Sequence, residues 1–567
     1  MFKRKTMFFI LSLVFMLVLV GCSSDESSTQ EETVRETETD ESEGNEASEY
    51  DTSPVTYTFF NAQTPGKDID TNQTRIGKLF EEQTGVNFRV EHIVGDVNTR
   101  IGTMVASGQY PDMISPDVAI DILLDAGAFI PLDDLLEEYG PNILEAYGPY
   151  LDLMRQEDGK IYYIPFGATH DYIPNPNIDQ GAFWIQRSVL KEFGYPEITT
   201  FEEYFDLIEE YHALYPQRDG SNTIGFTALT YDWRFFALAN PPMHLAGYPN
   251  DGDVIVDMDT FEAKVYANSE YTKRYLQKLN ELNSKGLFDR EAFVANYDEY
   301  LAKLTSGRVL GFFDYGWQVN QAFDNLLLAG NDDHRYMALP IVFEETEKDQ
   351  YLDPPAFISN RGVGITVSAD NPERIIQYFD NMIKEENQRL IMWGFEGEHY
   401  EVGDDGRFYR TNDQIALLED RSVKEDLGMW YFEWNWPRLN GQFSDGNAVE
   451  PRRQAEVARA AYREGDLDIL GMYGLDVFAD LFAEPDERPW FPAWSANIEQ
   501  GSAAQIFEQR SDDLKKRHFP RIVLASPADF EQEWEAFVTE YNKLDIEAFE
   551  SLMTDVVKQR IDQASGQ

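Results

Sequence analysis

The sequence predicts an α/β fold in which strands and helices alternate. Residues 55–60 are rich in β-branched and aromatic side chains, which favours a strand. Residues 74–83 carry apolar side chains at helical spacing, and residues 86–93 alternate as a second strand. A strand, a helix and a further strand in succession are typical of a parallel sheet. The apolar content of 43% is too high for a disordered chain.

Helix and turn signals continue along the chain. Thr200 and Glu203 form a potential capping box before an apolar stripe, which predicts a helix. Asn-Pro at 371–372 and Ser-Pro at 526–527 precede apolar residues at helical spacing and predict two more helices. We therefore expect the α/β body to extend over residues 54–567. Asp-Gly pairs, which favour hairpins and turns, lie at 158–159, 251–252 and 405–406.

The length and charge of the chain limit its function. At roughly 100–200 residues per domain, 567 residues predict two or more lobes. The chain has 47 basic and 102 acidic side chains, a formal net charge of −55. Because nucleic-acid binding depends on Lys and Arg that neutralise phosphates, we expect no nucleic-acid partner. With one cysteine, a disulfide within the chain is excluded.

Residues 1–22 have the layout of a secretory signal peptide, with a basic start at 3–5 and an apolar stretch at 7–20. That stretch is short for the ~20 residues that cross a bilayer as a helix. Residues 19–22, Leu-Val-Gly-Cys, resemble the lipobox of bacterial lipoproteins. This resemblance implies cleavage before Cys22 and acylation of its thiol, and two or more acyl chains would anchor the protein to a lipid bilayer. The alternative is an ordinary secretion signal followed by a chance cysteine.

Residues 23–53 hold 12 acidic side chains and one arginine, and they lack Phe, Trp, Leu and Ile. Such a segment cannot bury enough apolar surface to offset the entropy of ordering, so we expect a disordered acidic tether. Repulsion among its charges would extend it. The tether is expected to hold the α/β body away from the membrane or through a cell wall.

Six segments resemble motifs of the family 1 extracellular solute-binding proteins. They follow the order in which the motifs occur in that family, and six matches in order make the resemblance strong. The segments are 106–112 (ASGQYPD), 126–135 (AGAFIPLDDL), 158–165 (DGKIYYIP), 183–203, 306–317 and 393–400 (WGFEGEHY).

The resemblance implies a type II periplasmic-binding-protein fold. In this fold two α/β lobes, joined by a hinge, face each other across a cleft and close on a ligand. The first lobe is expected at 54–166 plus about 358–388. The second lobe is expected at about 167–357 plus about 389–567, including C-terminal helices.

The resemblance also implies a function. It indicates the solute-binding component of an ABC importer, anchored on the extracytoplasmic face of the cell membrane. Most relatives in the large lipoprotein subgroup bind sugars, commonly oligosaccharides. We therefore expect an oligosaccharide ligand, the transmembrane permease subunits as partners, and a monomer. The alternatives are a peptide or other small polar solute on the same fold, a secreted carbohydrate-active enzyme, and a sensor subunit.

A sugar site needs aromatic planes for C–H faces and polar side chains for hydroxyls. Any single tryptophan more often packs in a core, and Trp534 is expected there because of its helical spacing. Trp233 and Trp317 are better candidates, since their polar, Gly and Pro neighbours suggest loops. Aromatic and polar residues are interleaved at 232–234, 314–318, 433–436 and 488–491, and we expect at least two of these clusters to line the cleft. The candidate ligand-binding residues are Asn61, Asp112, His170, Asp171, Trp233, Asp314, Trp317, Trp434 and Trp490.

Four candidates are chosen by their position in the chain. Asn61 follows the first strand, and open α/β sheets bind ligands at the carboxyl ends of strands. His170 and Asp171 lie where the chain of the family crosses the cleft. Asp112 could face the cleft from a strand end, or it could be a turn carboxylate that accepts backbone amides.

The sequence lacks the common catalytic and metal motifs. It has no H-E-x-x-H, no G-x-x-x-x-G-K-[ST] loop and no G-x-S-x-G elbow, so we expect neither catalysis nor a cofactor. The acidic run at 250–259 could bind calcium, but it departs from the loop pattern that ends in a bidentate Glu, and a hairpin turn is preferred. The negative charge slightly disfavours an acidic ligand, although Arg234 or Arg488 could hold a uronate bidentately.

Overall fold

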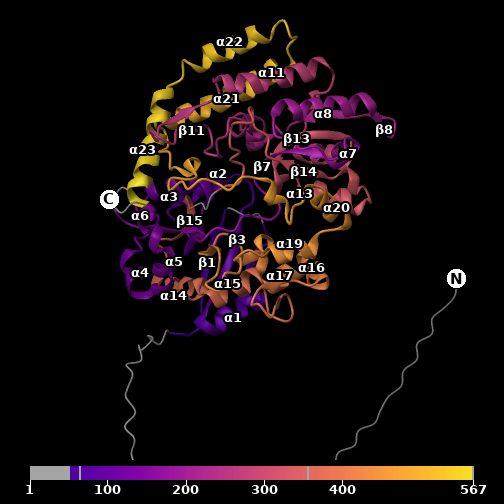
Figure 1. Ribbon diagram of the computed structural model, residues 1–567. Helices are drawn as coiled ribbons and strands as arrows, with labels where there is room; N and C mark the ends of the chain where they lie inside the picture. Colours follow the sequence, from indigo (N-terminus) through magenta and orange to yellow (C-terminus); the bar gives the residue numbers. More distant parts are fainter. Residues whose placement is uncertain (1–50, 63–65, 157, 354–356, 565–567) are drawn as a thin grey trace, which may run out of the picture. The chain divides into compact units, whose positions relative to one another are not determined.

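The described part of the chain covers residues 51–62, 66–156, 158–353 and 357–564 of a computed structural model (Figure 1). The predicted signal peptide, Cys22 and nearly all of the predicted tether lie outside the described residues. Among the helices within those ranges, none combines the length and apolar character that a membrane span requires.

Six strands form the first sheet, in the order β2-β3-β1-β4-β15-β5. β1 pairs in parallel with both β3 and β4, so that Asn61 is aligned with His92 and Ser115 where these strands end. β15 comes from a distant part of the chain and pairs antiparallel with β4 and β5. The strands are β1 (Val55–Asn61), β2 (Ile69–Asp70), β3 (Val86–His92), β4 (Met113–Ser115), β5 (Tyr163–Phe166) and β15 (Ile358–Ile365).

Both faces of the first sheet are covered. Phe59 points into one core cluster and Phe60 into another, because side chains alternate along a strand. Thr74 caps α1, and Gly85, at φ 72°, ends it before β3, which confirms the predicted strand, helix and strand. The helices are α1 (Arg75–Thr84), α2 (Val97–Ser107), α3 (Ile120–Asp125), α4 (Asp133–Tyr139), α5 (Pro141–Tyr147), α6 (Leu151–Met154), α14 (Pro372–Ile383) and α15 (Glu385–Met392).

Residues 391–457 extend this first lobe, although the sequence placed them in the second. Trp436 packs edge-on against Phe59 of β1, with ring centroids 4.9 Å apart, and side chains from Ile391 to Val457 share its core. The boundary expected near 389 is revised because such long-range contacts leave no local signal. The added elements are β16 (Glu401–Val402), β17 (Phe408–Tyr409), α16 (Asn412–Glu419), α17 (Arg421–Leu427), α18 (Met429–Phe432), β18 (Leu439–Gly441) and α19 (Ala455–Ala461).

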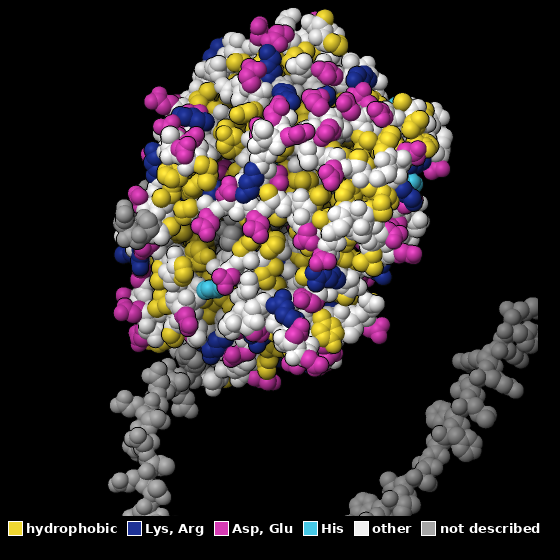
Figure 2. Space-filling view, in the orientation of Figure 1, with side chains coloured by type: hydrophobic (Ala, Val, Ile, Leu, Met, Phe, Trp, Pro, Cys, Tyr) yellow, Lys and Arg dark blue, Asp and Glu magenta, His cyan; other side chains and the backbone are white. Residues whose placement is uncertain are grey.

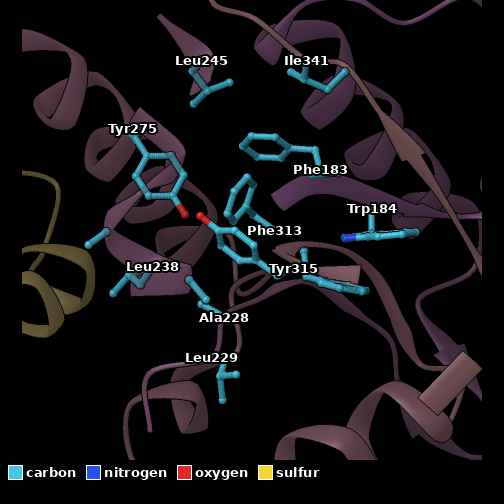
Figure 3. Close-up of a cluster of buried hydrophobic side chains, with 14 of the residues drawn as sticks. Phe183, Trp184, Ala228, Leu229, Leu238, Leu245, Tyr275, Phe313, Tyr315 and Ile341 are labelled. Carbon is cyan, nitrogen blue, oxygen red and sulfur yellow. The ribbon is translucent and has the colours of Figure 1, made fainter. Parts of the chain in front are cut away.

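A second sheet of four strands, in the order β10-β13-β7-β14, centres the second lobe. β13 pairs in parallel with β10 and antiparallel with β7. Figure 3 shows Phe183, Phe313 and Tyr315 of these strands in the core. The strands are β7 (Gly181–Gln186), β10 (Ile224–Thr227), β13 (Val309–Tyr315) and β14 (Tyr336–Leu339). Two small ribbons join β8 (Gln217–Arg218) to β9 (Ser221–Asn222) and β11 (Val254–Val256) to β12 (Ala263–Val265).

Helices enclose the second sheet. The predicted capping box is present, since the side chains of Thr200 and Glu203 bond reciprocally to the backbone. The C-terminal helices close this lobe, and Trp534, 4% exposed, lies in its core as predicted (Figure 1). The helices are α7 (Arg187–Glu192), α8 (Phe201–Leu214), α9 (Phe236–Ala239), α10 (Pro241–Leu245), α11 (Glu270–Ser284), α12 (Tyr297–Thr305), α13 (Gly316–Leu328), α20 (Glu464–Tyr473), α21 (Ala503–Leu524), α22 (Phe530–Tyr541) and α23 (Ile546–Ala564).

The chain passes between the two cores three times. In the first passage β6 (Ala168–His170) pairs in parallel with β18 of the first lobe. The core side chains that flank the passages assign them to residues 168–178, 352–357 and 457–469.

Candidate functional site

The carboxyl edge of the second sheet carries two of the predicted site residues. β10 and β13 are parallel, so the segments that follow them leave the sheet on the same side. α13 starts directly after β13, and a side chain at Gly316 would place its Cβ 2.0 Å from the carbonyl oxygen of Ile178. The amide of Trp317 donates to the carbonyl of Asp179 over 3.3 Å. The glycine thus lets the first turn of α13 press against residues 178–180 and fixes Trp317 there.

Trp233 and Trp317, here called the tryptophan pair, lie with their rings parallel. Their ring centroids are 6.0 Å apart and their planes differ by 8°. Trp233 comes from the short helix Asp232–Phe235 after β10, and the two side chains are 54% and 49% exposed. Phe236 packs against Trp233 at 5.7 Å. The pair therefore offers flat apolar surface to a ligand, and exposed aromatic surface of this kind marks binding sites.

Arg234 supports the tryptophan pair. Its guanidinium carbon lies 4.5 Å from the ring centroid of Trp233 and 4.3 Å from that of Tyr297. A planar guanidinium stacks well on aromatic faces, so these contacts hold the Trp233 ring in place.

Asp314 lies behind the tryptophan pair and does not reach the surface. The side chain is fully buried, and its carboxylate accepts hydrogen bonds from the hydroxyl of Tyr300 at 2.8 Å and the amide nitrogen of Gln318 at 2.7 Å. The backbone N–H of Tyr315 also donates to it at 2.7 Å. Burial raises the pKa of Asp314 to about 7. Asp314 therefore fixes the junction of β13 and α13, and its predicted contact with a ligand is replaced by this supporting role.

Trp434 provides a third exposed ring, in the first lobe. The side chain is 37% exposed, and the guanidinium of Arg438 lies 4.2 Å from its ring centroid. Trp436, two residues on, is 1% exposed and packs in the first core. Of the tryptophans in this segment, only Trp434 can offer a face to a ligand.

Buried charges connect Trp434 to the tryptophan pair. Glu450 accepts hydrogen bonds from Arg438 at 3.2 Å and from Arg452 and Arg453 at 3.0 Å each, and we call these four residues the Glu450 network. Burial alone would raise the pKa of Glu450, but the three guanidinium groups lower it well below its usual value. Arg452 also donates to the carboxylate of Asp179 at 2.7 Å. The sequence did not reveal this network, since Glu450 and Asp179 lie far apart in the chain.

Asn61 and Asp112 lie at opposite ends of the first sheet. Asn61 ends β1 and is 2% exposed, which agrees with the predicted carboxyl-end position. Asp112 precedes β4, and its carboxylate accepts the amide and the hydroxyl of Thr58, each at 2.7 Å. Its contacts match the alternative of a carboxylate that accepts a backbone amide, and it lies away from the carboxyl edge.

His170 and Asp171 lie on the first passage between the lobes. His170 ends β6 and is aligned with Gly441 of β18, and its carbonyl accepts the amide of Gln442 at 2.7 Å. Asp171 is exposed and adopts a left-handed backbone with φ 51°. Both residues remain candidates for contact with a ligand at the junction of the lobes.

Trp490 is the exception among the predicted tryptophans. It is 1% exposed, packs against Phe261 with centroids 5.7 Å apart, and belongs to the second core. Arg560 of α23 donates to its carbonyl at 2.8 Å. The Pro-flanked sequence suggested an exposed loop, but α23 covers that loop. In this structure Trp490 offers no surface to a ligand, and it is left out of the site proposed below.

The acidic run at 250–259 forms the start of the predicted hairpin, β11 and β12. Asp257 accepts the amide of Thr260 at 2.8 Å, and Asp253 pairs with Lys515 at 2.7 Å. Over the described ranges, no three His, Cys, Asp or Glu side chains gather as a metal site would require.

Comparison with known proteins identifies related sequences. A family model described as bacterial extracellular solute-binding protein matches residues 76–394. The chain is 28% identical over 308 residues to the fructooligosaccharide ABC transporter substrate-binding protein FusA of Streptococcus pneumoniae, covering 50% of this chain and 55% of FusA. It is 22% identical over 331 residues to the polygalacturonan/rhamnogalacturonan-binding protein YtcQ of Bacillus subtilis, covering 56% of this chain and 61% of YtcQ. The chain thus matches little more than half the length of these curated relatives.

Solved structures share the fold. FusA of S. pneumoniae in complex with kestose superposes with a TM-score of 0.64 at 19% identity, covering 89% of this chain and 99% of that one. An HMO-binding, ABC-transporter-associated solute-binding protein from Bifidobacterium longum infantis gives 0.64 at 12% identity, covering 90% and 99%. These similarities confirm the predicted α/β fold of the periplasmic-binding type.

Proposed function

Because the chain belongs to the family of bacterial extracellular solute-binding proteins, we propose that it binds an oligosaccharide outside the cytoplasm and delivers it to an ABC permease. Membership of the family agrees with the resemblance that six sequence motifs predicted. FusA and YtcQ are both named for binding saccharides, which supports a saccharide here. Their ligands differ in charge, since a fructooligosaccharide is neutral and a polygalacturonan is acidic. The family therefore leaves the charge of the ligand open.

The tryptophan pair is the observation that carries this proposal. The C–H faces of sugar rings stack on indole planes, and neighbouring polar groups take the hydroxyls. If a ligand covers about 100 Å² of each ring, the apolar term is about 2.5 kcal/mol per tryptophan. A pair of rings suits a chain of sugars better than a single small solute.

The two lobes provide a mechanism of capture. The tryptophan pair belongs to the second lobe and Trp434 to the first, and three chain passages join the lobes. We propose that the ligand stacks on the tryptophan pair and that the lobes close over it, which brings Trp434 and the first passage with His170 and Asp171 towards it. Asn61, at the carboxyl edge of the first sheet, is a candidate contact from the opposite side.

Titration calorimetry against a panel of neutral and acidic oligosaccharides tests this function. We expect micromolar or tighter binding of at least one saccharide of two or more rings. Binding of peptides, with silence across the saccharides, would contradict the proposal and favour the peptide alternative. Chromatography of the saccharide after long incubation tests binding against catalysis, and we expect the ligand to be recovered unchanged.

Anchoring at the membrane is a further part of the proposal. The lipobox at 19–22 supports acylation of Cys22, and the acidic segment at 23–53 would serve as a tether. In cells grown with a clickable fatty acid, we expect label on the full chain and none on a Cys22→Ala variant. Label that survives this substitution would show that the anchor is elsewhere.

A further inference from the structure

We infer that Arg234 binds a carboxylate of the ligand, so that the site selects an oligosaccharide that contains a uronate or a similar acidic sugar. This inference rests on the proposed function and specifies its ligand. It chooses between the two arginines that the sequence offered for this role, Arg234 and Arg488.

Arg234 is a charged group without a counter-charge. Within the described residues, its guanidinium forms no ion pair and donates no hydrogen bond, and its Nε is buried without a partner. Its flat face is occupied by Trp233 and Tyr297, at 4.5 and 4.3 Å. Stacking leaves the edge of a guanidinium, where the N–H groups lie, free to hold a carboxylate bidentately. A half-buried cation of this kind calls for an anion that is supplied from outside.

The other arginines near the proposed site are already neutralised. Arg488 is 6% exposed and lies 3.7 Å from the carboxylate of Asp251. Arg438, Arg452 and Arg453 share the carboxylate of Glu450, and Arg452 also pairs with Asp179. Arg234 is therefore the guanidinium that remains for a ligand.

The position of Arg234 suits a sugar that stacks on the tryptophan pair. The guanidinium touches the ring of Trp233, so a carboxylate on the stacked sugar or on its neighbour can reach it. Asp314, the buried carboxylate in electrostatic range, is occupied by three donors, and burial raises its pKa, which reduces its negative charge. It is thus a weak competitor for Arg234.

The negative charge of the chain does not prevent this binding. Asp and Glu side chains are spread over the visible face of the molecule (Figure 2), and they repel an acidic ligand at long range. Salt at physiological strength screens such repulsion beyond about 8 Å, whereas contact with Arg234 is a short-range interaction. Lower salt should therefore slow the approach of the ligand without abolishing the contact.

Matched pairs of ligands test the inference. Uronate oligosaccharides, such as oligogalacturonides and oligomers of guluronate and mannuronate, are compared with their carboxyl-reduced forms, which differ only in the charge. Calorimetry is run on the wild type and on Arg234→Met, Arg234→Lys and Arg290→Met. Arg290 is exposed on the same lobe and controls for the loss of one charge. Thermal unfolding of each variant confirms that it is folded.

We expect the wild type to bind at least one uronate oligosaccharide about 10- to 100-fold more tightly than its reduced form. Arg234→Met should remove this preference, Arg234→Lys should keep part of it, and Arg290→Met should keep all of it. A residue that only supports Trp233 would weaken both members of a pair equally, and this result would overturn the assignment. Binding of neutral saccharides with no gain from a carboxylate would also overturn it, while the proposed function stands. If no saccharide binds, both proposals fail.

Discussion

Arg452 Nη1 lies 2.7 Å from Asp179 Oδ2, and this ion pair joins the two lobes. Arg452 lies between Val449 and Val457 of the first core, whereas Asp179 follows Ile178 of the second. The carbonyl of Asp179 holds the amide of Trp317. The contact therefore connects the closure of the lobes to the position of the tryptophan pair.

Loss of this ion pair should weaken ligand binding modestly. The side chain of Arg452 is 48% exposed, so solvent screens the pair and its contribution is about 0.5–1 kcal/mol. For Asp179→Asn we expect a two- to fivefold higher Kd and a slightly larger radius of gyration without ligand, measured by calorimetry and small-angle scattering. The control is Asp333→Asn, which breaks the exposed pair with Lys191 within the second lobe. Identical values for both variants would show that the pair does not favour closure.

Trp317→Ala should reduce affinity without reducing stability. The ring is 49% exposed, so its removal opens no cavity, but a stacked sugar loses about 1.5–3 kcal/mol of contact. We expect an affinity loss of about 10- to 100-fold. Far-ultraviolet circular dichroism should also lose the coupled signal of two parallel indoles. Tyr409→Ala, an exposed ring on the β16–β17 ribbon, is the control. Unchanged affinity for Trp317→Ala would remove the tryptophan pair from the site.

Trp490→Ala should have the opposite effect. The ring is 1% exposed in the second core, and truncation of such a side chain costs about 3–5 kcal/mol through lost contacts and a cavity. Urea unfolding should show this loss, while the protein that remains folded binds ligand with nearly wild-type Kd. A large affinity loss at unchanged stability would instead return Trp490 to the binding site.

Local signals in the sequence predicted the elements well. The Asn-Pro pair at 371–372 opens α14, the capping box opens α8, and the spacing of Trp534 placed it in the core. These features depend on residues within a few positions of each other. The exposed rings of Trp233 and Trp317 were also found from their polar neighbours.

Long-range packing explains what the sequence could not predict. Trp490 has polar and Pro neighbours like the exposed tryptophans, but Arg560, 70 residues away, brings α23 over it. Asp112 follows a proline in a loop, and only the register of β4 against β1 shows that Thr58 occupies it. The lobe that receives residues 391–457 is fixed by contacts such as that of Trp436 with Phe59. None of these relationships has a sequence spacing that a local pattern can report.

Glu450→Gln should destabilise the protein. Three arginines share the Glu450 carboxylate, and removing the charge leaves them buried without compensation, which costs about 3–5 kcal/mol. The pKa of Glu450 is lowered in the folded state, so its contribution is complete above about pH 4.3 and is lost as pH falls further. Urea unfolding at pH 7 and at pH 3.5 should show a smaller difference between wild type and variant at the lower pH. An equal difference at both values would contradict the proposed ionic role.

Asp314→Asn should change how stability depends on pH. Burial raises the pKa of Asp314 to about 7, so the folded state binds a proton that the unfolded state releases near pH 3.9. Between these values the stability of the wild type should fall as pH rises, by a total of the order of 2–4 kcal/mol. The asparagine cannot ionise, so the variant should lack this part of the decline and gain relative stability from pH 5 to pH 8 in urea titrations. Asp232→Asn, exposed beside Trp233, should leave the profile unchanged. Parallel profiles for the wild type and Asp314→Asn would mean that Asp314 ionises at an ordinary pH.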